Sequence, residues 1–421
     1  MIYAPMFTND AIVLGILSVS LAIIFYTSSI KTGFWSKFYK VVPALLMCYL
    51  VPAVFNSLNI ISDKESNLYY VASRYLLPAS LVLLTLSIDL KAIANLGYKA
   101  LIMFFTGTVG IVIGGPIAIL LIAIVSPETV GGVGPDAVWR GLATLAGSWI
   151  GGGANQAAML EIFEYNPEKY GGMVLVDIVV ANIWMAVILI GIGKKNAIDS
   201  WLKADNSAID DLKERVSNYT KSVSKIPNLA DYMIMLGFAF TAVGIAHFSA
   251  DEISSFLTSS FEVFNNKKSA LSSFASQFFW MVSITTLIGV GLSFTKAKTY
   301  EGAGASKIGS IFIYFLVATI GMKMDLATIF ENPGLLAIGL VWMSIHAGLL
   351  ILVAKLIKAP YFFLAVGSQA NVGGAASAPV VAAAFHPSLT SVGVLLAVFG
   401  YVVGTYAALA CTMLMEIASK F

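Results

Sequence analysis

Long apolar segments recur along the whole chain, and they constrain its fold more than any other feature of the sequence. A helix needs about 20 apolar residues to cross the roughly 30 Å of hydrocarbon in a bilayer, and most segments approach or exceed that length. Only 11% of the residues are charged, whereas soluble domains contain about 25%. We therefore predict an all-α polytopic membrane protein. The segments cover residues 11–30, 41–61, 70–88, 97–125, 140–163 and 171–193, and then 230–250, 273–295, 306–322, 334–357, 361–385 and 391–418.

A charged stretch separates the first six apolar segments from the last six. Residues 194–229 carry charges of both signs, a pattern that is typical of a solvent-exposed surface helix. We interpret this stretch as a linker between a first half, residues 1–193, and a second half, residues 230–421. The amino-terminal residues contain no basic region, so we expect no cleavable signal peptide.

The two halves resemble each other in the order of their features. Asp89 is matched by Asp325, each followed by a leucine, and a long apolar segment and a glycine-rich motif come next in both halves. A proline then lies at the same distance beyond each motif, at Pro167 and Pro387. The spacing differs only by an extra loop, SPETVGGVGPDAVWR, in the first half. This register predicts a duplication, with chance similarity among apolar stretches as the alternative.

The distribution of Lys and Arg predicts the orientation of the halves, because short cytoplasmic loops are enriched in these residues. Most of the basic residues fall on one side only if the two glycine-rich segments enter the membrane and turn back. Each half then has about five transmembrane helices and one re-entrant hairpin or broken helix. An odd number of crossings makes the halves two inverted repeats. Both termini are predicted outside, with the linker in the cytoplasm.

The glycine-rich motifs, GSWIGGGANQAAM from Gly147 and GSQANVGGAASAP from Gly367, interrupt apolar segments. Non-helical backbone at membrane depth is tolerated only where protein or a watery cavity surrounds it. Broken segments at matching positions of inverted halves point to the binding site of a secondary transporter, with half-helix N-termini directed at the ligand. Helix packing by small residues is the alternative, but it does not explain the amides. The predicted substrate-binding residues are Ser148, Gly151, Gly152, Gly153, Asn155, Gln156, Ser368, Gln369, Asn371, Gly373, Gly374 and Ser377.

Ionisable residues within apolar segments are few, and each is a functional candidate. Asp177, with Asn182 further along, is predicted to bind a coupling cation or to titrate a coupling proton; a partly hydrated position near the outer interface is the alternative. The second half has no carboxylate at the corresponding place. His346 is expected to join helices by hydrogen bonds rather than to carry protons, and Asp89 and Asp325 are expected to cap helices.

Further candidate ligands for a cation lie in the motifs themselves. A sodium ion is expected near Asn155 and Asn371, and the site otherwise needs no metal or cofactor, only Na⁺ or H⁺ as the coupling ion. Tyr401 and Thr405 are polar residues that would line the pathway. Cys48 and Cys411 lie in apolar segments and are expected to be buried as small hydrophobic residues.

The sequence offers little for catalysis. It contains no HExxH zinc motif, no GxSG serine motif and no phosphate loop of the GxxxxGK[ST] type. We therefore expect that the protein is not an enzyme. A channel is the alternative of another class, because re-entrant half-helices also build channels. No nucleic-acid partner is expected; the expected partners are a small organic solute, a coupling cation and the lipid bilayer.

The paired motifs, GSWIGGGAN and GSQANVGGAASAP, and the order of segments around them resemble the YjcL-like integral membrane family, domain of unknown function 819. That family is similar to the superfamily of cation/proton antiporters and anion transporters. The resemblance implies a homodimer in the bacterial inner membrane, with a scaffold (11–61 and 230–295) and a mobile transport core (70–193 and 306–418). The core would move by an elevator mechanism.

The function predicted from all of this is secondary active transport, namely sodium-coupled symport of a small organic anion or zwitterion between the hairpin tips. A sodium/proton-type antiporter that uses Asp177 is the first alternative. The first tip reads GGGAN and the second NVGGAAS, unlike the GGxG-type tips of functional relatives, and neither tip carries an arginine. The substrate therefore cannot be transferred from the resemblance.

Overall fold

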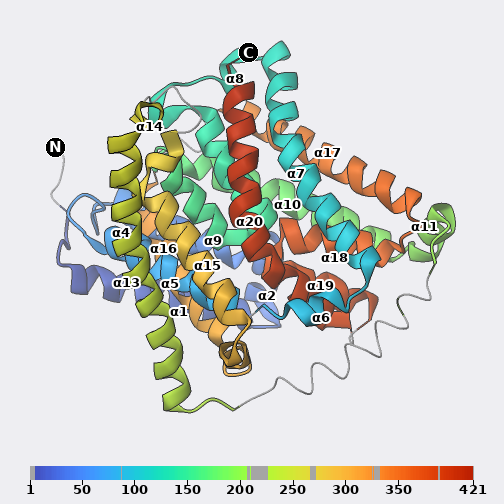
Figure 1. Cartoon of the computed structure of the whole chain (residues 1–421), viewed down its shortest axis with the longest axis horizontal. Helices are drawn as coiled ribbons and strands as arrows, with labels where there is room; N and C mark the ends of the chain where they lie inside the picture. Colours follow the sequence, from blue (N-terminus) through green and yellow to red (C-terminus); the bar gives the residue numbers. More distant parts are fainter. Residues whose placement is uncertain are drawn as a thin grey trace.

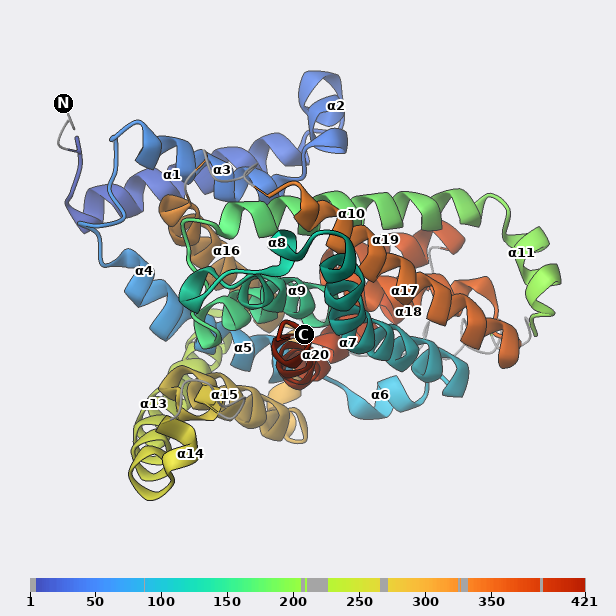
Figure 2. The same ribbon diagram turned by 90° about the horizontal axis from the view of Figure 1, so that it is seen from above.

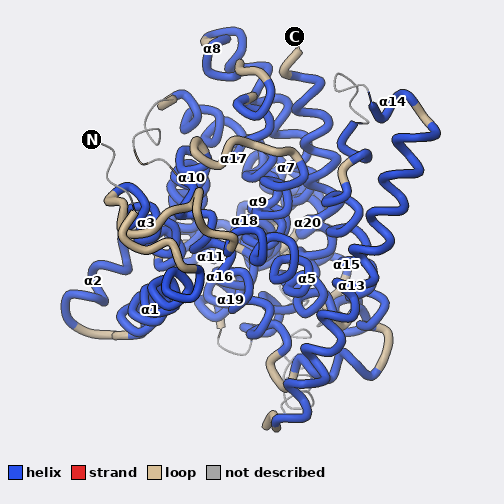
Figure 3. The backbone as a smooth tube through the Cα atoms, turned by 90° about the vertical axis from the view of Figure 1, so that its left-hand side faces the viewer, coloured by secondary structure: helices blue, strands red, loops and turns tan. Residues whose placement is uncertain are grey.

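The computed structural model describes residues 5–86, 88–205, 209, 226–265, 272–324, 326, 332–386 and 389–420. Within these ranges every regular element is a helix, and the only pairing of extended backbone is an isolated bridge between Phe7 and Ile61 (Figure 3). The predicted all-α class is confirmed. Asp325 and Pro387, two of the residues on which the internal repeat was argued, lie outside the described residues.

The helices of the first half follow the predicted apolar segments closely. Asn9 begins α1 by accepting hydrogen bonds from the backbone N–H groups of Ala11 and Ile12, as N-cap residues do. The helices are α1 (Asp10–Ser29), α2 (Gly33–Val41), α3 (Ala44–Ser57), α4 (Leu68–Val71), a π-helical turn η1 (Ala72–Leu76), α5 (Leu77–Leu86), α6 (Leu90–Ala94), α7 (Tyr98–Val125), α8 (Pro127–Val130), η2 (Gly134–Asp136), α9 (Val138–Ile162) and α10 (Tyr170–Ile192).

The linker begins with a short helix, α11 (Lys195–Leu202), at the place where alternating charges predicted one. The second half starts at a capping box, in which Asn228 and Asp231 bond to each other's backbone N–H groups. Its helices are α13 (Leu229–Ser260), α14 (Glu262–Asn265), η3 (Ser272–Ala275), α15 (Gln277–Ser293), η4 (Lys296–Glu301), α16 (Ala305–Lys323), α17 (Gly334–Leu356), α18 (Tyr361–Val372), α19 (Gly374–Phe385) and α20 (Thr390–Ala418).

In the described part of the chain, eight helical segments are long and apolar enough to cross a membrane, or nine if α2 and α3 form one bent span. The ten full spans of the sequence prediction are therefore not all present. The remaining two candidates are short: α3 has 14 residues and α15 has 17, or about 21 and 26 Å at 1.5 Å per residue. Neither alone matches the roughly 30 Å of a typical hydrocarbon core.

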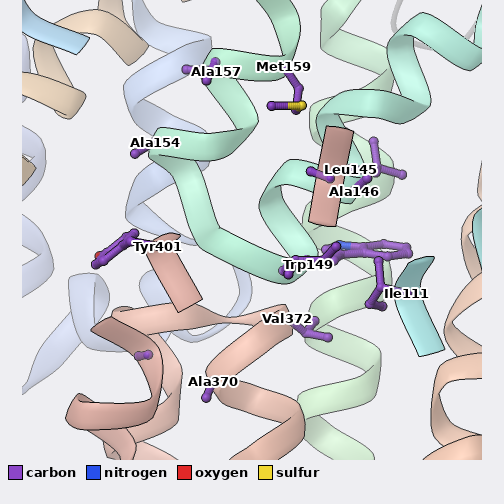
Figure 4. Packing of buried hydrophobic residues seen from close by; sticks show 14 of the residues in the cluster. Ile111, Leu145, Ala146, Trp149, Ala154, Ala157, Met159, Ala370, Val372 and Tyr401 are labelled. Carbon is purple, nitrogen blue, oxygen red and sulfur yellow. The ribbon is translucent and has the colours of Figure 1, made fainter. Parts of the chain in front are cut away.

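The glycine-rich segment of the first half is a helical hairpin. The chain reverses at Gly152 inside α9, so that the two arms lie side by side (Figure 4). A Cβ added at Gly147 on the first arm would lie 2.6 Å from the carbonyl oxygen of Asn155 on the second arm. The ends of the hairpin also meet, because the rings of Trp139 and Phe163 pack 5.9 Å apart.

The corresponding segment of the second half is also a hairpin, formed by α18 and α19 around Gly373. Its ends come together through the rings of Tyr361 and Phe385, whose centroids are 5.8 Å apart. Neither hairpin is among the eight membrane-crossing candidates. Both segments therefore turn back, as the distribution of basic residues predicted.

The helices form a central group, which contains both hairpins, and two arms beside it. Seen from above, α7, α9, α10 and α17–α20 lie together, while α1–α3 and α13–α15 form two arms to one side (Figure 2). Between them, α5 packs against α13, α15 and α16, and α16 packs against α3. The long helices α7, α13 and α20 run through most of the molecule (Figure 1).

Glycines along one face of α7 allow α17 to approach closely. A Cβ at Gly110 would lie 3.0 Å from His346 Cα, and one at Gly114 would overlap the ring of Trp342, which lies 2.6 Å away. Small residues at such spacing let membrane helices pack backbone to backbone. This contact fixes the position of His346 beside the second hairpin and of Trp342 beside Trp149 in the first.

Cysteine labelling tests the first hairpin. In a background without Cys48 and Cys411, we expect Val133→Cys and Glu164→Cys to react with a membrane-impermeant maleimide from the same side. Both positions are exposed and flank α9. Lys195→Cys, at the far end of α10, should react only from the other side. Labelling of Val133→Cys and Glu164→Cys from opposite sides would show that α9 crosses the membrane.

Candidate functional site

The tips of the two hairpins meet. Gly152 and Gly374 both adopt positive φ angles, +73° and +53°, which L-residues with side chains rarely adopt. A Cβ at Gly374 would lie 3.8 Å from Gly152 Cα. Gly152, Gly153 and Gly373 are only half-buried, although α9 and α18 are otherwise largely buried. The breaks therefore place half-exposed backbone from both halves of the chain at one point.

Helix α20 passes directly over both tips. A Cβ at Gly400 would lie 3.1 Å from the carbonyl oxygen of Ile150 and 3.2 Å from that of Ala370. One turn further, a Cβ at Gly404 would overlap the Cα of Gly151. These two glycines were not among the predicted site residues. Their GxxxG spacing was a signal for a close helix contact that could have identified them.

Asp177 on α10 connects the two arms of the first hairpin. Its Oδ2 accepts hydrogen bonds from Ser148 Oγ at 2.8 Å and Gln156 Nε2 at 3.0 Å. Its Oδ1 accepts one from Trp149 Nε1 at 2.7 Å. Ser148 and Trp149 belong to the first arm and Gln156 to the second. Asp177 is only 6% exposed, so the alternative of a partly hydrated carboxylate at the interface is not what the structure shows.

Asn155 fastens the first hairpin to α20. Its Nδ2 donates to the carbonyl oxygens of Tyr401, at 2.9 Å, and Gly151, at 3.2 Å. Its Oδ1 accepts a hydrogen bond from Thr405 at 2.6 Å. Tyr401 and Thr405 were predicted to line the pathway. In the structure their hydrogen bonds to Asn155 hold the hairpin against α20.

Asn371 makes the same arrangement in the second hairpin, with α7 as its partner. Its Nδ2 donates to the carbonyl oxygens of Phe104, at 3.0 Å, and Gly367, at 2.9 Å. Its Oδ1 accepts a hydrogen bond from Thr108 at 2.8 Å. Both asparagines are fully buried, and all their amide groups are used. A sodium ion at either amide oxygen, as the sequence analysis expected, would have to compete with a threonine.

His346 is part of a buried chain of hydrogen bonds on the second hairpin. Its Nδ1 lies 3.0 Å from the carbonyl oxygen of Gly107, which can only accept, so Nδ1 carries a proton. Its Nε2 lies 2.8 Å from Ser368 Oγ, which also accepts from Trp184 Nε1 at 2.7 Å. Ser368 therefore connects His346 to Trp184. His346 joins α7, α17 and α18, as expected.

Gln369 lies beneath the second tip and has an unused donor. Its Oε1 accepts a hydrogen bond from Ser377 Oγ at 2.6 Å, which connects α18 to the first turn of α19. Its Nε2 is buried and has no hydrogen-bond partner among the described residues. Buried polar groups are rarely left unpaired, and each exception calls for an explanation such as a ligand or water.

Asn182 is the one predicted site residue that stands apart. It is exposed on α10, and its Nδ2 donates to the carbonyl oxygen of Ile178 in its own helix, at 2.7 Å. The other predicted residues lie in the two hairpins, except Asp177, which bonds to the first hairpin from α10. The indoles of Trp149 and Trp184, which bind Asp177 and Ser368, were missed because nothing in their spacing distinguishes them from apolar packing residues.

The glycine breaks, the polar tips and the apolar spans define an all-helical, multi-pass membrane protein with two internal hairpins. The family model described as "Protein of unknown function (DUF819)" matches residues 15–417, so the chain belongs to this family. The chain is also 25% identical over 369 residues to "Uncharacterized membrane protein YjcL" of Bacillus subtilis (strain 168), which covers 84% of this chain and 85% of that protein. The family resemblance stated from the motifs is confirmed.

A pair of glycine variants tests the packing of α20 on the first hairpin. Gly404→Ala should lower the free energy of unfolding by about 2 kcal/mol, because the new methyl group overlaps Gly151 in a close-packed contact. Gly237→Ala in α13 has open space around the new Cβ and should leave the melting temperature unchanged or slightly higher. The measurement is thermal unfolding in detergent. Equal effects of both variants would contradict this packing.

Proposed function

We propose that this protein is a secondary active transporter that binds a small organic anion or zwitterion between its two hairpin tips. The contact between Gly152 and Gly374 carries this proposal, because it brings half-exposed backbone from both halves to one point. The second arm of α9 and helix α19 both begin at that point. The first N–H groups of a helix have no acceptor within the helix, and they carry partial positive charge.

Gln369 supports a ligand with hydrogen-bond acceptors. Its unpaired Nε2 lies in the same hairpin as the first turn of α19, and Ser377 holds its amide. A carboxylate at the tips would accept hydrogen bonds from this amide and from the N–H groups of Gly374 and its neighbours. Such a ligand is bound by neutral donors, and therefore it can also leave.

The packing of the helices supports inverted repeats. In an inverted arrangement α3 corresponds to α15 and α5 to α16, and the contacts follow this exchange: α15 packs on α5, and α3 packs on α16. Likewise α20 packs on α7, and α10 packs on α17. We propose an elevator mechanism in a bacterial inner membrane, with the linker in the cytoplasm, both termini outside and a homodimer as the working unit.

We also propose a larger scaffold than the one that the sequence suggested. We placed residues 70–88 and 306–322 in the transport core, but the helices that they form, α5 and α16, pack against α3, α13 and α15. We therefore propose that α5 and α16 belong to the scaffold. The transport core then consists of α7, α9, α10 and α17–α20. These helices contain the hydrogen bonds described above for the two tips.

We propose sodium as the coupling ion, with protons as the alternative. A ligand that binds the folded state stabilises it by mass action. The melting temperature should therefore rise with sodium in a saturable way, whereas potassium and choline at the same ionic strength should have no such effect. An absence of any sodium effect, together with a shift that follows pH, would contradict sodium coupling and favour protons.

The antiporter alternative depends on Asp177, whose carboxylate is the only buried one in contact with the hairpin tips among the described residues. Asp177→Asn keeps the size of the side chain but turns an NH₂ group toward one or two of the three donors that surround it. Each donor left unpaired costs about 1–3 kcal/mol. The variant should be less stable but should still bind substrate if the protein is a symporter.

The measurement is counter-flow and proton-coupled exchange in proteoliposomes, with Asp136→Asn in the outer loop as the control variant. Full retention of proton-coupled exchange in Asp177→Asn would rule out an antiporter that uses Asp177. Loss of exchange in a folded Asp177→Asn protein would favour it over symport. Flux that neither saturates nor shows counter-flow would instead indicate a channel.

A further inference from the structure

A second polar site lies away from the hairpin tips. A cavity of about 940 Å³ opens between α4–η1, the end of the first hairpin, α13 and α15. None of the residues that line this cavity was predicted from the sequence to be a site residue. Its lining includes one arginine, three carboxylates and a histidine: Arg74, Glu161, Glu164, Asp251 and His247.

Arg74 is held in an unusual position for a membrane-helix residue. It lies in the π-helical turn η1, and π-helical turns are frequent at functional sites. The carbonyl oxygen of Arg74 accepts a hydrogen bond from His247 Nε2 at 2.9 Å. Its guanidinium lies over the ring of Phe278, with the centre 4.6 Å from the ring centroid. These contacts orient the side chain toward the cavity.

Most of the donors of this guanidinium remain available. Nη1 donates to Glu161 Oε2 at 2.5 Å and to Ser73 Oγ at 3.1 Å. For Nη2 and Nε, the described residues provide no hydrogen-bond acceptor. The Arg74 side chain is 31% exposed, whereas the Glu161 side chain is 9% exposed. A planar fork with free N–H groups on a cavity suits a second carboxylate.

The other charges on the lining favour a ligand that also carries a positive charge. Glu164 and Asp251 are exposed there, and the cavity holds more carboxylates than cations. A dianion would be repelled by these carboxylates, and a simple amine would leave the Arg74 fork unused. A zwitterion satisfies both, with its carboxylate at Arg74 and its ammonium group toward the acidic residues.

We propose that this cavity is an entry site for a zwitterionic substrate such as an amino acid, and that Glu161 occupies Arg74 when the site is empty. The inference rests on the proposed transport function, and it names the substrate class. Arg74 belongs to the helix that carries α5, which we assign to the scaffold, and Glu161 belongs to the second arm of the first hairpin. A substrate carboxylate that replaces Glu161 would release the hairpin from the scaffold.

Thermal shifts of the full-length protein in detergent test this site. The probes are L-alanine, L-serine and L-glutamine as zwitterions, with succinate as a dianion and ethanolamine as an amine. We expect the zwitterions to stabilise the wild type in a saturable way. Stabilisation by succinate or ethanolamine in their place, or by none of the probes, would overturn the proposal.

Variants of the ion pair make the test specific. Arg74→Gln should weaken zwitterion binding at least about tenfold, because a charge-assisted hydrogen bond is lost. Arg74→Lys keeps the positive charge but not the planar guanidinium, and it should also weaken binding. It is the second variant to test if Arg74→Gln does not fold. Glu161→Gln removes the internal competitor and should strengthen binding several-fold. Lys169→Gln breaks an exposed ion pair with Asp136, outside the cavity, and is the matched control.

The decisive result is that Arg74→Gln weakens zwitterion binding whereas Glu161→Gln strengthens it. If Arg74 and Glu161 formed a purely structural ion pair, both variants would lower the melting temperature and neither would change the affinity for the zwitterion. That outcome would overturn the entry site. The assay measures binding and needs no coupling ion, so a failure of sodium coupling or of transport would be seen separately and would leave this result standing.

Discussion

The fold is organised around interrupted helices in an apolar environment. Wherever a helix breaks, N–H and C=O groups lose their partners, and in hydrocarbon nothing replaces them unless other parts of the protein do. Here the two breaks lie against each other, and α20 packs on both. Gly400 and Gly404 allow this because a larger residue at either place would collide with the backbone of a hairpin.

The polar side chains near the breaks are arranged on the same principle. Asp177 is surrounded by an indole, a hydroxyl and an amide, and His346 by a carbonyl group and a hydroxyl. These groups are matched donor to acceptor, without a cation beside the carboxylate among the described residues. A satisfied polar network in a low dielectric is rigid, and this rigidity suits the elevator movement that we propose for the hairpins. Gln369, with its unused donor, is the exception at the centre.

Much of this fold could be read from the sequence, because apolar length and the distribution of charge reflect the bilayer directly. The positions of the helices, the two reversals at Gly152 and Gly373, and the helix at Lys195 follow from such patterns. The partners of the polar residues could not be predicted. Nothing local to Trp149 or Thr405 shows that they face Asp177 and Asn155, since these contacts arise from the crossing of distant helices.

Arg74 shows the limit most clearly. As the fifth residue of the predicted segment 70–88, it has the position of a charge at the membrane surface. Only the π-helical turn and the neighbouring helices place it on a cavity. The short lengths of α3 and α15 could not be predicted for a related reason. Apolar sequence runs on beyond the ends of α3 and α15, but the backbone leaves the helix there.

The hydrogen bonds of Asn155 and Asn371 also have a consequence for the insertion of the growing chain into the membrane. Asn155 comes from the first half, yet its partners, Tyr401 and Thr405, lie in the last helix. Asn371 comes from the second half and depends on α7 of the first. The first hairpin therefore enters the membrane long before the residues that satisfy its amide have been synthesised. Until α20 is inserted, this tip must remain hydrated or be shielded by another protein, and a chain that ends before Thr405 leaves it permanently open.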